Sequence, residues 1–122
     1  MVDQICLAVP VLPNRADGAI AFMKELETSR RSEYEASERR IGITKEVWFL
    51  ARGANGDQLL AYMESPAFAQ ALAQFAQSQD AFDQWFKQRL AAVTGVDLNN
   101  PPSGPLSELL SSYEAEAAQA SA

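Results

Sequence analysis

The first candidate for chemistry is a carboxylate that stands among apolar residues. Glu46 shares a predicted strand face with Trp48 and Leu50, because side chains two residues apart in a strand point to the same side. A buried carboxyl group has a raised pKa and can act as a general base. A solvated strand end, or a salt bridge at the rim of a dimer, is the more common role for a glutamate in such a position.

A second candidate group lies at the end of a predicted helix. Arg39 and Arg40 follow Tyr34 within two turns, and guanidinium groups offer forked donors that bind a carboxylate or a phosphate. The more common alternative is that these cations complement the helix dipole and that Arg39 pairs with Glu35.

Aromatic residues form a third group. Trp48, Tyr62, Trp85 and Phe86 could line an aromatic pocket near one end of a sheet. Aromatic residues at strand and helix spacing belong more often to a core than to a ligand cage. Across the three groups, the candidate ligand-binding residues are Tyr34, Arg40, Glu46, Trp48, Tyr62 and Trp85.

The composition argues against several classes of site. The chain has no histidine, so a Ser-His-Asp triad, a histidine-ligated haem and the usual catalytic zinc centre are poor candidates. It also has no glycine-rich phosphate loop and no paired-cysteine motif. Asp80 and Asp83 fit helix starts rather than metal ligands. We therefore expect neither a metal nor a cofactor.

The net charge and the hydropathy of the sequence limit the classes of binding partner and the cellular compartments that can be expected. The net charge of −6 argues against nucleic acid and against an anionic membrane surface. No run of about 20 apolar residues, the length that spans a membrane, occurs in the sequence, and the first residues lack the basic region of a signal peptide. A cytoplasmic protein is expected. Cys6, the single cysteine, lies within an apolar run and is expected to be a small buried hydrophobe.

The stretch 43–64 predicts a β-hairpin that would position these candidates. Two apolar runs flank Asn55 and Gly56, a dipeptide that favours a two-residue type I′ turn. That turn would place Trp48 opposite Met63. One face of the hairpin then carries Trp48, Leu50, Leu59, Ala61 and Met63, and the other carries Val47, Phe49, Ala51, Leu60 and Tyr62. Both faces are apolar, so both are expected to be covered.

The remaining segments alternate with this hairpin. Residues 5–11 predict a buried central strand, and residues 17–40 predict one long helix that ends at Gly42. Helical spacing returns after Ser65, breaks at Asp80 and ends at Gly95. Residues 106–114 fit a helix by their period, but the order of the other elements favours a strand. Residues 115–122 are expected to be a flexible C-terminal tail.

The resulting order, β-α-β-β-α-β over residues 1–114, predicts a single α+β domain of the ferredoxin-like type. Its antiparallel sheet would carry both long helices on one face. The other face of the hairpin needs a separate cover, and a second copy of the chain, packed sheet to sheet, is the simplest candidate.

Three stretches and a proline-rich connector carry a resemblance to a known superfamily. They are residues 33–43, 82–87 and 95–98, and the connector before residues 108–110. The chain resembles the dimeric α/β-barrel superfamily of ferredoxin-like proteins, and more closely a small bacterial family of unknown function within it, related in fold to antibiotic-biosynthesis-monooxygenase-like proteins. This resemblance implies a homodimer, a final strand, and a pocket between sheet and helices. The histidines of haem-degrading relatives are absent here.

These observations favour one function over two others. The favoured hypothesis is a small homodimer that binds a small apolar or aromatic ligand between sheet and helices, or acts as an accessory protein. The alternative is a cofactor-independent monooxygenase or isomerase in the manner of the superfamily. A purely structural role, with a solid core and no pocket, is the third.

Overall fold

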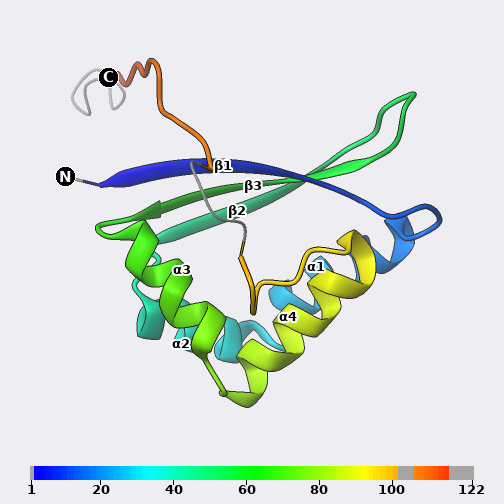
Figure 1. Cartoon of the computed structure of the whole chain (residues 1–122), viewed down its shortest axis with the longest axis horizontal. Helices are drawn as coiled ribbons and strands as arrows, with labels where there is room; N and C mark the ends of the chain where they lie inside the picture. The colour runs from blue at the N-terminus through cyan, green and yellow to red at the C-terminus, as the bar shows by residue number, and fades with distance from the viewer. Residues whose placement is uncertain (1, 102–105, 116–122) are drawn as a thin grey trace.

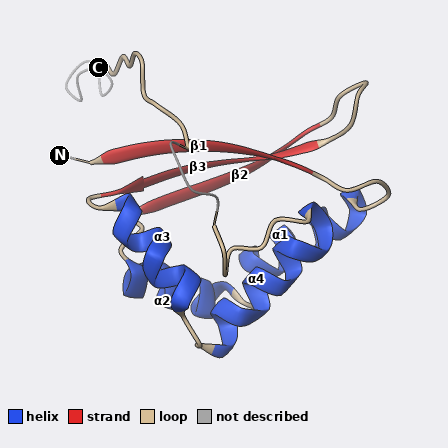
Figure 2. Cartoon of the chain, viewed as in Figure 1, coloured by secondary structure: helices blue, strands red, loops and turns tan. Residues whose placement is uncertain are grey.

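The computed structural model describes residues 2–101 and 106–115, so the predicted C-terminal tail lies almost wholly outside the described residues. Within these residues the fold is α+β, with four helices on one side of a three-stranded antiparallel sheet (Figure 1, Figure 2). The elements are β1 (Asp3–Pro10), α1 (Ala16–Glu27), α2 (Arg31–Ile41), β2 (Lys45–Ala51), β3 (Gln58–Ser65), α3 (Phe68–Gln77) and α4 (Ala81–Thr94).

The strand order is β1-β3-β2, so β3 is the central strand and the prediction that residues 5–11 form a central strand is wrong for the described residues. The predicted hairpin is present, but its register is two residues away from the expected one. Trp48 pairs with Ala61 rather than with Met63, because residues 52–57 form a wider loop. Gly56 has a φ of +124°, and its N–H donates to the carbonyl of Gly53. An even shift keeps every side chain on its predicted face.

The single long helix predicted over residues 17–40 is wrong, because the chain forms two helices there. Thr28 leaves the helical conformation at φ −126°, ψ −92°. Its hydroxyl donates to the Lys24 carbonyl at 2.7 Å, and the N–H of Arg30 reaches the Glu25 carbonyl. The break lets α1 pack on α4 while α2 contacts both α3 and α4. As predicted, α2 ends at Gly42, which has a φ of +92°.

The boundary between α3 and α4 follows the prediction. Asp80 is the N-cap of α4 and accepts a hydrogen bond from the N–H of Phe82 at 3.1 Å. Lys87, almost fully buried, donates from Nζ to three carbonyls at the end of α3. An ammonium group therefore caps the last turn of α3 from within α4. Gly95, with a φ of +79°, ends α4.

The core fills the space between the sheet and the helices, and the opposite face of the sheet is open in the single chain. Phe49 on this outer face is 56% exposed. Cys6 also lies there and is exposed, so the expectation of a buried thiol is wrong. Its strand is at the edge of the sheet and its side chain points away from the helices.

The strand predicted over residues 106–114 is absent from the described part of the chain. Leu106 packs beside Ile43 and Phe68, and the hydroxyl of Ser107 accepts a hydrogen bond from the N–H of Cys6 at 3.1 Å. The segment therefore reaches the free edge of β1 through one side chain and forms no backbone ladder. The apolar side chains that follow are exposed, and Leu110 has 85% of its surface accessible.

Candidate functional site

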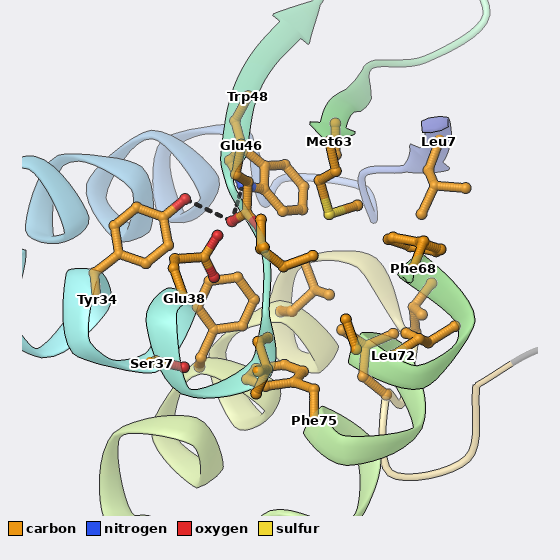
Figure 3. A pocket seen from close by; sticks show the side chains of 18 of the residues that line it. Leu7, Tyr34, Ser37, Glu38, Glu46, Trp48, Met63, Phe68, Leu72 and Phe75 are labelled. Atoms are coloured by element: carbon orange, nitrogen blue, oxygen red, sulfur yellow. Dashed lines mark hydrogen bonds between the residues drawn. The ribbon is translucent and has the colours of Figure 1, made fainter. Parts of the chain in front are cut away.

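A cavity of about 80 Å³ lies between the inner face of the sheet and helices α2, α3 and α4. Its walls are almost entirely apolar, because the inward faces of β1 and β3 meet the aromatic faces of the helices. Figure 3 shows the lining side chains converging from sheet and helices. They include Leu7, Ala61, Met63, Phe68, Phe75 and Phe86.

One wall of the cavity is polar, and Glu46 of β2 is at its centre. Its Oε2 accepts a hydrogen bond from the Tyr34 hydroxyl at 2.5 Å and another from Nε1 of Trp48 at 2.8 Å (Figure 3). The two donors approach from different elements, Tyr34 from α2 and Trp48 from the same face of β2. The structure thus brings together three of the six predicted site residues. Burial, followed by the neighbouring charge of Glu46, raises the pKa of Tyr34, which keeps the hydroxyl protonated as a donor.

Glu38 completes this wall and was not among the predicted residues. Its Oε2 is buried and has no hydrogen-bond partner among the described residues. Burial raises the pKa of Glu38 to about 10, and the neighbouring charge of Glu46 acts in the same direction. Glu38 therefore holds its proton at neutral pH.

A wider groove of about 620 Å³ lies on the other side of this polar wall, between α1, α2 and the edge strand β2. Tyr34, Glu38, Glu46 and Trp48 line both the cavity and the groove, as does Ile43. The groove is more open to solvent than the cavity. These shared side chains therefore form the partition between the groove and the cavity.

The other predicted site residues lie elsewhere. Arg40 binds Asp83 at 3.0 Å and Asp80 at 3.2 Å, outside the cavity. Tyr62 is on the outer face of the sheet, where its hydroxyl donates to Glu64 at 2.6 Å. Trp85 packs on the far side of α4, with the Arg30 guanidinium 4.1 Å from its ring centre. The predicted aromatic group is thus divided, and Trp48 and Phe86 are its members at the cavity.

Asp83 lies at the start of α4 as predicted, and it also joins this helix to its neighbours. Its carboxylate is completely buried and accepts hydrogen bonds from the hydroxyls of Ser37 and Ser78, each at 2.5 Å, in addition to the bond from Arg40. These donors come from α2 and from the turn after α3. Asp83 therefore joins three helices behind the cavity.

The sequence carries a signal for Glu38. Residues 34, 37, 38 and 41 stand at i, i+3, i+4 and i+7, so they share one helix face. All four line the cavity. A glutamate on the buried stripe of a helix is unusual, and this was the available indication of a functional group.

The chemistry open to this site is that of protons and hydrogen bonds. The edge of an apolar space here brings together two carboxyl groups, a phenol and an indole N–H. In the described residues, no group of three or more metal-ligating side chains occurs, and no helix there is long and apolar enough to cross a membrane.

Comparison with known proteins adds no further assignment. No family model matches the chain, and neither a curated protein nor a solved structure matches it.

Proposed function

We propose that the protein binds a small, mainly apolar ligand in the cavity between sheet and helices, with one polar group of the ligand directed at the Tyr34–Glu38–Glu46–Trp48 wall. The observation that carries this proposal is the distribution of polar groups along the cavity. The lining is apolar except at one end, where a single cluster of hydrogen-bonding groups lies. Ligand sites typically combine an apolar lining with a few polar groups that orient the ligand.

The size of the cavity supports a compact ligand. Its volume of about 80 Å³ is roughly half that of the ~150 Å³ engineered cavity that accommodates benzene. A single-ring compound would need a small outward movement of the walls. The partition side chains are the natural place for this movement, because the groove lies directly behind them.

Tryptophan fluorescence tests the proposal with a matched pair of variants. Trp48 lines the cavity and Trp85 does not. In Trp85→Phe, which retains Trp48, we expect benzyl alcohol to change the emission in a saturable way. In Trp48→Phe, which retains Trp85, the emission should stay constant. A response confined to Trp85, or no saturable response in either variant, would refute binding in this cavity.

Proton transfer is a second candidate function. Of the two activities expected as alternatives, monooxygenase and isomerase, the acid–carboxylate pair favours the isomerase. Glu46 could accept a proton from a substrate carbon, and Glu38, whose pKa is raised by burial, could return one. Loss of a detected isomerisation in Glu46→Gln, with ligand binding retained, would support this activity.

The finer fold and the assembly are also part of the proposal. We propose that the domain is a ferredoxin-like relative of the dimeric α/β barrels and forms a homodimer through the outer sheet face. The order β1-β3-β2 leaves the edge of β1 for a fourth strand, and Leu106 and Ser107 already lie there. Phe49 and Cys6 would be covered in such a dimer.

Native mass spectrometry and thiol labelling test the assembly together. We expect the mass of two chains and a Cys6 thiol that reacts more slowly in the dimer than in a Phe49→Lys variant. A clean monomer with a fast-reacting thiol would contradict the dimer.

A further inference from the structure

The polar wall of the cavity holds two carboxyl groups, Glu38 and Glu46, that form no ion pair within the described residues. Burial beside Glu46 raises the pKa of Glu38. The groups that donate to Glu46, Tyr34 and Trp48, are neutral. Both carboxyl groups are half-buried, and a cation beside them would interact more strongly than in bulk water because the surroundings are apolar.

The surroundings of this charge suit an organic cation. Aromatic rings stand on the cavity side of the pair, with the centre of Phe86 6.3 Å from that of Trp48 and 6.4 Å from that of Tyr34. Rings present a negative face that attracts ammonium groups, most strongly where water is excluded. The groove on the other side provides an approach from solvent, and the net charge of −6 raises the local concentration of cations.

We infer that the ligand of this site is a small organic amine, whose ammonium group binds between Glu38 and Glu46 and whose apolar body fills the cavity. This inference rests on the proposed function and narrows it. An anionic ligand would meet the charge of Glu46, and a neutral ligand would leave that charge unbalanced. An ammonium group with a hydrocarbon body matches both the carboxyl pair and the apolar lining.

Binding of such a cation should release a proton from the protein. Glu38 is protonated because it is buried beside Glu46. The titratable groups that face it are Tyr34 on its own helix, Glu46 on β2 and Asp83 on α4, and Asp83 is paired with Arg40. An ammonium group next to Glu38 favours its ionised form, so the proton leaves as the ligand enters. The chain has no histidine whose titration would obscure this effect between pH 6 and 8.

Calorimetric titration with benzylamine, benzyl alcohol and benzoate tests the inference, since the three probes share a ring and differ in charge. We expect benzylamine to bind at least tenfold more tightly than benzyl alcohol and benzoate not to bind. The affinity for benzylamine should rise between pH 6 and 8, by up to tenfold per pH unit if one proton is released. In Glu38→Gln this pH dependence should disappear.

Two further variants distinguish an effect of the carboxyl pair at the cavity from a general effect of removing a carboxylate from the protein. Glu46→Gln should weaken benzylamine binding by more than tenfold, and Glu64→Gln, on the outer face of the sheet, should leave it unchanged. Equal or tighter binding of benzyl alcohol would overturn the amine inference while the proposed apolar site stands. Failure of both benzylamine and benzyl alcohol to bind would overturn the two together. If Glu46→Gln does not fold, the lost pH dependence in Glu38→Gln decides the question alone.

Discussion

The hydroxyl of Tyr34 donates a 2.5 Å hydrogen bond to Oε2 of Glu46 and so joins helix α2 to the edge strand β2. The same oxygen also accepts the indole N–H of Trp48. These contacts hold the carboxylate at the boundary between an apolar cavity and an open groove. The stability of the fold and the chemistry of the site therefore depend on the same few atoms.

Replacing Tyr34 with Phe should destabilise the protein by about 1–3 kcal/mol, because a half-buried carboxylate loses a donor. The free energy of unfolding in urea measures the effect. Tyr62→Phe is the matched control, since its hydroxyl bonds Glu64 on the outer face of the sheet, and a change within about 0.5 kcal/mol is expected there. Equal losses in the two variants would show that Glu46 does not depend on Tyr34.

Raising the pH should weaken the fold through Glu38. The pKa of this carboxyl is 4.5 in its ordinary state and about 10 in the folded protein. The folded state thus binds more protons across that window, so its stability is complete below the lower value and falls as pH rises towards the upper one. The contribution of this group to the slope is at most about 1.4 kcal/mol per pH unit.

Glu38→Gln isolates that contribution, because glutamine keeps a neutral donor beside Glu46. Urea unfolding at pH 6 and pH 8 should show wild type losing more stability than the variant between the two. Parallel losses would indicate that Glu38 is ionised in the folded protein.

Asp83→Ala should cost about 3–5 kcal/mol, because Arg40 and two serine hydroxyls lose a shared, buried acceptor. Asp80→Ala removes a helix cap at a more exposed position and should cost about 1 kcal/mol. Thermal or urea unfolding of the two variants gives the comparison. A cost for Asp83→Ala no larger than that for Asp80→Ala would contradict its role as the junction of three helices.

Lys87→Met should destabilise the protein by about 2–3 kcal/mol, since three carbonyls at the end of α3 lose an ammonium donor. Burial lowers the pKa of Lys87, and the charges of Asp83 and Asp97 oppose this shift. Lys24→Met, at an exposed position of α1, is the control and should change stability by less than about 0.5 kcal/mol. Hydrogen exchange should show the last turn of α3 opening in Lys87→Met and not in the control.

Periodicity predicted which residues share a face, and those predictions are confirmed. Trp48 and Glu46 lie on the inner face of the hairpin because side-chain alternation survives an even shift in register. Asn55 and Gly56 did not indicate the length of the loop. The N–H of Gly56 donates to the carbonyl of Gly53, and this turn lies inside the wider loop of residues 52–57. The turn preference of Asn55 and Gly56 therefore predicted that a hairpin forms, but not which residues pair across its two strands.

The break between α1 and α2 had no clear mark in the sequence. No glycine or proline stands between Glu27 and Arg31, and the break depends on the side-chain bond from Thr28 to the Lys24 carbonyl. Packing of the two helices on different partners stabilises this bend. The same tertiary context turns Glu38 inward, on the helix face that it shares with Tyr34, Ser37 and Ile41 in the sequence pattern.

Methyl NMR of the protein labelled at its methionine ε-methyl groups would test the central claim most directly. Met63 lines the cavity and Met23 lines only the groove, so each reports one compartment. On addition of benzylamine, we expect a saturable shift of the Met63 signal and a nuclear Overhauser contact between the aromatic ring of the ligand and that methyl group. A response at Met23 with none at Met63 would contradict a ligand in the cavity and place the compound in the groove.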